Sequence, residues 1–416
     1  MQDASAKPAA LKFTGYQKFV VGILAFLQFS IILDFMVIAP LGAIVMPALQ
    51  ITPQQFALVV SAYAFSAGVS AMLAAGFADR FDRKKLLLFF YTGFILGTAL
   101  CAVAATFHLL LAARIVTGIF GGVIGSIVMA ITTDLFALEI RGRVMGIVQT
   151  AFAASQILGL PIALYLANAW NWHAPFVLII VVGSAVGVVI MMGLKPVDMH
   201  LGLKQEHSPL MHLVHTITDP RYLLAFATVT LLATGGFMIM PFSSAFTVNN
   251  LGISLDHLPT VYLATGLCTI FVGPLIGRAS DRFGKFRVFA FGTAVSVIMA
   301  LIYTHLGETP LPVVIAVNAV MFVGIFSRII PATALMSAIP DVTKRGAFNA
   351  VSSSLQQVSG GIASVIAGFI VVQNADGHIS HFDRVGYVVI GAALITVTLM
   401  YRIHRSIVER TAKPAV

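Results

Sequence analysis

Charged residues are scarce in this chain of 416 residues: they make up 10% of it, whereas hydrophobic residues make up 59%. Soluble domains carry about 25% charged residues, and the mean hydropathy here is +0.96, so the composition excludes an ordinary soluble protein. Cysteine is nearly absent as well. Cys101 and Cys268 fall in apolar runs, one in each half, and we expect packed thiols rather than a disulfide.

Several motifs that would indicate catalysis are missing. The sequence has no phosphate-binding Gly-Lys-Ser/Thr loop, which argues against direct use of ATP. No paired-carboxylate, Ser/His/Asp or metal-ligand cluster falls within an apolar run. His207, His212 and His215 lack the cysteine or carboxylate spacing of a metal site. We therefore expect a protein that is not an enzyme and uses no metal or cofactor.

Long apolar runs dominate what is present. A helix needs about 20 apolar residues to cross a bilayer, and the chain contains twelve runs that approach or exceed this length. They cover residues 18–45, 54–77, 86–105, 108–137, 143–168, 173–194, 222–248, 258–280, 286–305, 311–339, 346–373 and 386–403. The sequence therefore predicts an all-α membrane protein with 12 transmembrane helices, surrounded by the lipid bilayer.

The basic residues predict how the chain is oriented. All but three of its 25 Lys and Arg residues lie on the side of the two termini; Arg384 is opposite, and Arg114 and Arg328 lie within spans. The positive-inside rule makes both termini cytoplasmic. Residues 1–17 lack the regions of a cleaved signal peptide. The net charge of +9 is spread over short loops, which argues against nucleic-acid binding.

Two halves of the chain repeat the same short motifs at nearly constant spacing. The matching pairs are DRF at 79–81 and 281–283, DFMVIAP at 34–40 and GFMIMP at 236–241, TGIFGGVIG at 117–125 and VGIFSRIIP at 323–331, and RG at 141–142 and 345–346. Such a parallel repeat is typical of transporters that bind substrate between two six-helix units. The predicted organisation is an N-terminal tail 1–17, a bundle 18–194, a cytoplasmic linker 195–220, a second bundle 221–403 and a C-terminal tail 404–416.

Over essentially the whole chain these motifs resemble the major facilitator superfamily. Its loop signature after the second helix is matched in the second half by Gly277, Asp281, Arg282, Gly284 and Lys285. The first half keeps Asp79, Arg80, Arg83, Lys84 and Lys85, with Ala75 and Asp82 at the glycine positions. A fourth-helix signature resembles Arg114, Gly118, Gly121 and Gly122. The resemblance implies two pseudo-symmetric six-helix bundles and a small-molecule substrate.

Within that family, LDFMVIAPLGAIVMPAL looks most like the first helix of proton-linked drug and sugar efflux carriers. The fifth-helix antiporter signature is only partly kept, since ILGLPIALY retains Gly159 and Pro161 but not the later glycines. We expect a monomeric secondary transporter of the bacterial inner membrane that exchanges protons for an exported amphiphilic or polar compound. An organic-anion exchanger or symporter centred on Arg114 and Arg328 is the alternative, and a non-transporting receptor or scaffold is a third possibility.

Asp34 lies near the middle of the first apolar run, where an ionised carboxylate is costly without a partner, a proton or water. A helix rises about 1.5 Å per residue, so counting residues from the span ends places Asp34 and Arg114 at similar depth in the membrane. Movement between two environments could load and release a proton, which would make Asp34 a proton carrier; a permanent structural ion pair is the alternative. Arg114 shares a face with Gly118, Gly121 and Gly125, so it could instead lock the fourth helix to its neighbours.

Arg328 has no charged counterpart in the first half, where the repeat places Gly122. A buried Arg without a nearby carboxylate suggests an anionic substrate group or cavity water as its partner. Helix packing and pairing with Asp34 are the alternatives.

Polar residues on two further helices fall on coherent faces that could line a substrate cavity or bond between helices. They are Gln149 and Gln156 in the fifth span and Asn349, Ser353 and Gln356 in the eleventh, with Tyr63 and Asn318 as weaker candidates on type and depth.

The repeated loop motif predicts a cytoplasmic gate. Its members are Asp79, Arg80, Arg83, Asp281, Arg282 and Lys285. An Asp at a helix end beside Arg side chains could hold the two halves together in one state and release them in the other. Topological anchoring explains the basic residues equally well.

Overall fold

The computed structural model describes residues 13–74, 77–198, 201, 215–341 and 344–412, and all that follows concerns these residues. The first half contains α1 (Gly15–Val37), α2 (Gly42–Leu49), α3 (Pro53–Ala74), η1 (Ala78–Arg80), α4 (Arg83–Ala102), α5 (Phe107–Leu135), α6 (Leu138–Ala154), the π-helical turn η2 (Ser155–Gly159), α7 (Leu160–Ala169) and α8 (Ala174–Gly193). The second half contains α10 (Pro220–Asn249), η4 (Leu255–His257), α11 (Leu258–Phe283), α12 (Lys285–Thr304), α13 (Leu311–Met336), α14 (Arg345–Ile370), a short antiparallel hairpin of β1 (Val372–Gln373) and β2 (Ile379–Ser380), and α15 (Phe382–Ala412).

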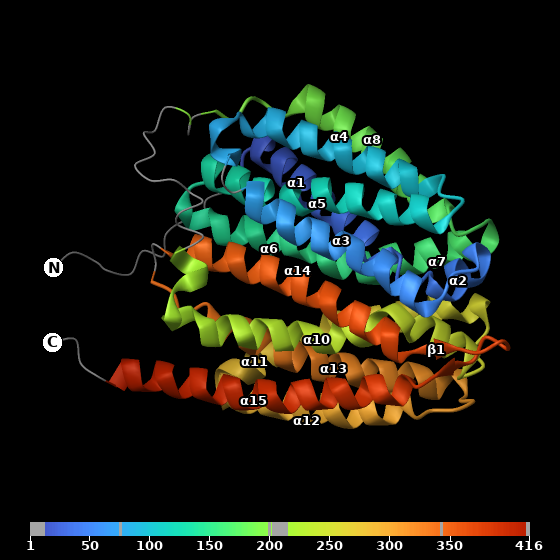
Figure 1. Ribbon diagram of the computed structural model, residues 1–416. Helices are drawn as coiled ribbons and strands as arrows, with labels where there is room; N and C mark the ends of the chain where they lie inside the picture. The colour runs from blue at the N-terminus through green and yellow to red at the C-terminus, as the bar shows by residue number, and fades with distance from the viewer. Residues whose placement is uncertain (1–12, 75–76, 199–200, 202–214, 342–343, 413–416) are drawn as a thin grey trace.

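Eleven helical segments of the described chain are long and apolar enough to cross a membrane. α14 has comparable length and runs alongside them, which gives the twelfth expected span (Figure 1). Its sequence, RGAFNAVSSSLQQVSGGIASVIAGFI, carries many polar side chains, and this lowers its mean hydropathy. The polarity is tolerated because α14 packs closely against α3 of the other half and is not wholly bounded by lipid.

The helices form two adjacent bundles, with the first half above and the second half below in Figure 1. α1 begins and α15 ends at the same end of the molecule, which we call the proximal end; the hairpin and α2 lie at the distal end (Figure 1). α15 extends to Ala412, past the predicted bundle limit at residue 403. The fold is an all-α membrane architecture, as the sequence predicts.

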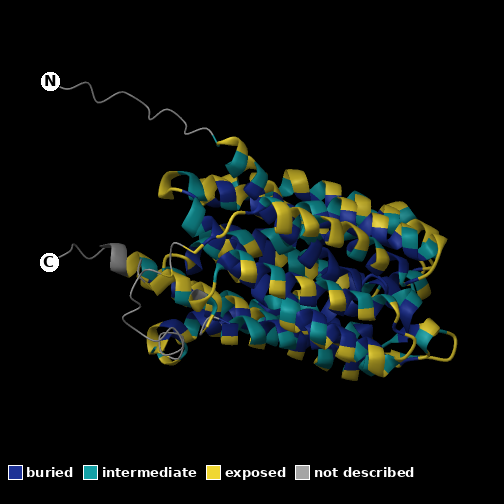
Figure 2. Ribbon diagram, turned by 90° about the horizontal axis from the view of Figure 1, so that it is seen from above, coloured by how far each residue is buried: buried dark blue, intermediate teal, exposed yellow. Residues whose placement is uncertain are grey.

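Large apolar side chains cover the outside of the bundles. Phe89, Phe271 and Phe369 are each more than 60% exposed, while apolar residues such as Leu24 and Phe94 are fully buried. Figure 2 shows buried residues concentrated inside and exposed residues along the outer helix faces. An exposed apolar belt on a folded protein is stable in hydrocarbon rather than water, so this surface faces lipid.

Two predicted spans are interrupted at prolines. The predicted helix 18–45 is broken, because α1 ends at Val37 and α2 begins only at Gly42, on either side of a turn that contains Pro40. The fifth span changes to a π-helical turn at η2, and Pro161 follows in the first turn of α7. Proline has no N–H to donate to the preceding turn, so one helical hydrogen bond is lost there and a change of backbone pattern becomes less costly.

Hydrogen bonds between the two bundles lie towards the distal end, although α3 and α14 also stay in close contact nearer the proximal end, where a Cβ on Gly68 would lie 3.1 Å from the carbonyl oxygen of Ser354. Three hydrogen bonds join described residues of different bundles, and all lie in the distal half. The pairs are Asn168 Nδ2 to the Leu255 carbonyl at 2.6 Å, Ser244 Oγ to the Ala39 carbonyl at 3.1 Å, and Ser364 Oγ to the Ala57 carbonyl at 3.4 Å. Glycines bring the backbones together as well: a Cβ on Gly266 would lie 3.1 Å from the carbonyl oxygen of Gln156.

Glycines of α5 create the space in which α3 packs. A Cβ on Gly122 would lie 2.5 Å from both the Cα and the carbonyl oxygen of Ala67, and one on Gly118 would lie 2.6 Å from the carbonyl oxygen of Tyr63. Gly125 faces open space instead, although the sequence places it on the same stripe. Close backbone approach through small residues is a common way for membrane helices to associate.

This packing gives a stability prediction. Gly122→Ala should destabilise the folded protein by about 1–3 kcal/mol, because the added methyl meets backbone atoms that cannot rotate away. Gly125→Ala is the matched control and should have no comparable effect, since nothing lies within 4 Å of its Cβ position. Thermal unfolding of both variants in detergent measures the difference; equal midpoints would contradict the proposed helix contact.

Candidate functional site

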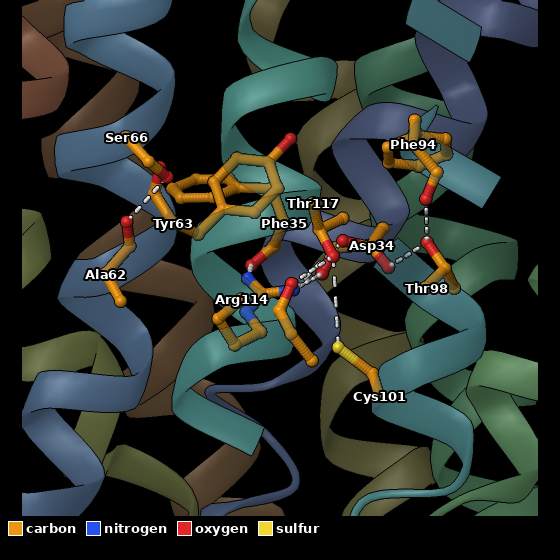
Figure 3. Close-up of polar contacts among 11 residues, drawn as sticks. Asp34, Phe35, Ala62, Tyr63, Ser66, Phe94, Thr98, Cys101, Arg114 and Thr117 are labelled. Carbon is orange, nitrogen blue, oxygen red and sulfur yellow. Dashed lines mark hydrogen bonds and ion pairs between the residues drawn. The ribbon is translucent and has the colours of Figure 1, made fainter. Parts of the chain in front are cut away.

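Asp34 and Arg114 form an ion pair inside the first bundle, where neither side chain exposes any surface. Arg114 Nη1 donates to Asp34 Oδ2 at 2.9 Å, and the Thr98 hydroxyl donates to Asp34 Oδ1 at 3.1 Å (Figure 3). Arg114, Asp34 and Thr98 come from α5, α1 and α4, respectively. Each carboxylate oxygen therefore has a donor, which offsets part of the cost of keeping two charges out of water.

Arg114 also binds the end of α1. Its Nη1 donates to the Asp34 carbonyl at 3.1 Å and its Nη2 to the Phe35 carbonyl at 3.5 Å. α1 ends at Val37, whose carbonyl accepts from the Leu41 N–H at 3.3 Å, and Arg114 adds side-chain donors to two other carbonyls of the last turn. A cation is favourable there both as a donor and against the negative end of the helix dipole. One guanidinium thus joins a mid-membrane acid to the point where the first span breaks.

Aromatic and polar side chains close the site. The Arg114 Cζ lies 4.6 Å from the centre of the Tyr63 ring, and Tyr63 lies 5.2 Å from Phe35, ring centre to ring centre. The Tyr63 hydroxyl and Arg114 Nε are buried without a hydrogen-bond partner in the described chain. Cys101 is a free, buried thiol whose sulfur lies 3.9 Å from the Thr117 hydroxyl. In this conformation the pair has no open path to either end.

Arg328 lies in the second bundle and does not reach Asp34. Its guanidinium carbon is 6.0 Å from the centre of the Phe289 ring, and its Nη1 is 3.6 Å from the Cβ position of Gly235. The residue is 6% exposed, and its Nε is buried without a partner. No hydrogen bond or ion pair connects its guanidinium to another described residue. The alternative pairing of Arg328 with Asp34 is not seen, because Asp34 bonds to Arg114.

The other predicted cavity residues occupy different environments. Gln156 is buried, and its amide nitrogen lies 3.7 Å from the Met36 sulfur. Asn318 is partly buried and donates to the Val314 carbonyl of its own helix at 2.9 Å. The more proximal polar residues are less enclosed: they are Gln149 on α6, and Asn349, Ser353 and Gln356 on α14.

The predicted gate residues make their observed contacts within their own halves. Arg83 is buried; its Nε lies 3.3 Å from Asp134 Oδ2, and its Nη1 donates to the Ala78 carbonyl at 3.1 Å. Lys285 Nζ is 3.9 Å from Asp281 Oδ1, and the Arg282 guanidinium carbon is 5.4 Å from the centre of the Phe283 ring. Arg80 is exposed, and the side chain of Asp79 lies outside the described part of the structure.

Sequence reasoning missed two residues of these clusters. Thr98 was not selected, although its position near the far end of the third span puts a hydroxyl at the depth of Asp34. Asp134 was also missed. The available signal was an acid near the end of an apolar run, on the same side of the membrane as the basic residues that begin α4.

A family model described as Major Facilitator Superfamily matches residues 24–367 and, again, 225–413. The chain belongs to the Major Facilitator Superfamily. Its relatives include the uncharacterized MFS-type transporter YceJ of Bacillus subtilis, 26% identical over 82% of this chain and 87% of that protein. Multidrug resistance protein 3 of the same organism is 29% identical over 44% of this chain and 35% of its own length. The family assignment makes this a multi-pass membrane transporter with two six-helix bundles.

Solved structures of superfamily members show the same fold. A bacterial homolog of the human lysosomal transporter Spinster, in an inward-facing and occupied conformation, superposes with a TM-score of 0.76 at 13% identity, covering 97% of this chain and 100% of that one. A mutant of the nucleoside transporter NupG gives a TM-score of 0.72 at 12% identity and covers 93% of this chain and 99% of that one. At such low identities the likeness establishes the fold alone.

Proposed function

We propose that this superfamily member is a proton-coupled antiporter that exports a small amphiphilic or polar compound by alternating access. The observation that carries the proposal is the buried ion pair of Asp34 and Arg114 at the broken end of α1. Relatedness to a multidrug resistance protein supports export. The scarcity of basic residues on the side away from the termini supports an orientation in which the proximal end faces the cytoplasm.

A proton changes the forces at this site. When Asp34 is ionised, Arg114 holds both its carboxylate and the carbonyls at the end of α1. Protonation removes the negative charge, so the ion pair no longer holds α5 to α1 and the two helices can separate at lower cost. The pair is closed in this conformation, so a second conformation must give the proton its path. The proton thereby biases which conformation is stable.

The conformation seen here fits a transporter that is closed at its distal end. Cross-bundle hydrogen bonds lie in the distal half, whereas polar residues such as Gln149 and Asn349 near the proximal end are exposed. The gate residues Arg83 and Asp281 bond within their own halves, as a gate in its open state would. In the opposite state we expect these charges to engage across the halves.

Locking the distal contact tests alternating access. Gly368 of α14 packs directly on the Ala57 methyl of α3, so cysteines at the two positions should form a disulfide after a small adjustment. In a background with Cys101→Ala and Cys268→Ala, oxidation of Ala57→Cys/Gly368→Cys should stop transport, because the distal end can no longer open. Reduction should restore transport, and each single cysteine variant is the control. Full transport in the oxidised pair would contradict alternating access.

A further inference from the structure

We propose that the second bundle contains a binding site for an anionic group of the substrate, a carboxylate or phosphate, at Arg328. The inference deepens the proposed function, since it names the chemistry of the exported compound. It does not depend on proton coupling, because binding at Arg328 involves none of the atoms that hold Asp34.

The positive charge of Arg328 is not balanced by the residues around it. Arg328 is only 6% exposed near the middle of the membrane span that α13 forms, and its guanidinium forms no hydrogen bond or ion pair with a described residue. The sequence places no Asp or Glu between the ends of any span in the second half. A buried cation without a counter-charge is costly, and such residues in membrane proteins usually mark a ligand or ion path. A planar guanidinium is suited to bidentate contact with carboxylate or phosphate oxygens.

The internal repeat shows that the second bundle also lacks the acid of the first. The repeat aligns Asp34 with Gly236, so the second bundle has a glycine where the first has its acid. Nothing lies within 4 Å of the Cβ position of Gly236, while the preceding Gly235 adjoins the guanidinium of Arg328. Arg328 is not the repeat counterpart of Arg114, since the repeat places Gly122 at its position. The first bundle nevertheless supplies a carboxylate to its buried arginine, whereas the second leaves its buried arginine beside glycine backbone. A ligand carboxylate or phosphate would complete the second pair.

The position also connects the two bundles. Phe237 follows Gly236 on α10, and its ring centre lies 5.9 Å from that of Phe35 on α1. The carbonyl of Phe35 is one of the groups that Arg114 binds. α10 thus carries Gly235 beside Arg328 and Phe237 beside α1, so one helix touches both the proposed anion site and the end of α1.

Ligand-induced thermal shifts of the purified full-length protein in detergent test the proposal. The probes are 4-phenylbutyrate and inorganic phosphate, with uncharged 4-phenylbutyramide as the matched control. At least one anion should raise the unfolding temperature of the unmodified protein more than the amide does. Arg328→Gln should weaken anion binding about tenfold to a hundredfold and leave the response to the amide unchanged. Arg328→Lys should retain part of the response.

A second pair of variants leaves the arginine in place. Gly235→Asp places a carboxylate beside the Arg328 guanidinium, whose Nη1 lies 3.6 Å from the Cβ position of Gly235, and should remove the anion response, whereas Gly235→Asn adds similar volume without charge and should retain it. Equal responses to the anions and the amide, an unchanged response in Arg328→Gln, or no response to any anion would overturn the proposal. Stabilisation only by phosphatidylglycerol would assign the site to a lipid head group and overturn it too. Asp34→Asn should keep the anion response, so loss of proton coupling and loss of this site are separate results.

Discussion

Replacing Asp34 with Asn should reduce proton-driven transport to the level of protein-free vesicles. The amide has nearly the shape of the carboxyl group but cannot take up or release a proton, so a pH gradient loses its means of biasing the two conformations. Uptake of a substrate into inverted vesicles after an imposed pH gradient measures the effect. We expect the variant to remain folded, because the proposed transport cycle passes through a form in which Asp34 carries no charge.

Asp219→Asn is the matched control. Asp219 lies at the proximal surface, where its carboxylate accepts a hydrogen bond from the backbone N–H of Arg221 at the start of α10. Asn caps helices about as well as Asp, so this variant should transport normally. Undiminished proton-driven transport by Asp34→Asn would instead make the ion pair structural, which is the alternative that the sequence left open.

Replacing Arg114 with Gln should lower the free energy of unfolding by about 3–5 kcal/mol, because it removes one partner of a fully buried ion pair. The carbonyls of Asp34 and Phe35 at the end of α1 lose their donor in the same step. Denaturant unfolding in detergent, followed by circular dichroism, measures the loss.

A double-mutant cycle separates the ion pair from the capping of α1. Asp34→Asn/Arg114→Gln carries neither charge, so it should be more stable than Arg114→Gln alone. The stability that it still lacks relative to the unmodified protein should reflect the lost bonds to the two carbonyls and the lost stacking on Tyr63. Additive effects of the two substitutions would show that the pair contributes no coupling energy.

Helix positions were predictable from sequence because apolar length is set by bilayer thickness. The run 311–339 became α13 at Leu311–Met336, and the run 258–280 became α11 at Leu258–Phe283. The break after Val37 was not predicted, although Pro40 lies within it. A hydropathy profile cannot show such a break, since the turn residues are themselves apolar. The Asp34 carbonyl near the break also bonds to a residue far away in the sequence, Arg114.

Sequence by itself determined the class of protein, the two matched halves and the depth at which Asp34 and Arg114 meet, because composition and rise along a helix depend only on order in the chain. Tertiary structure decided which arginine takes the acid. Arg114 and Arg328 look alike in sequence, yet one is bonded to Asp34 and the other lies beside Gly235 in the second bundle. Depth is a one-dimensional property, whereas pairing depends on how each helix is rotated and which helices adjoin it, and only packing fixes these.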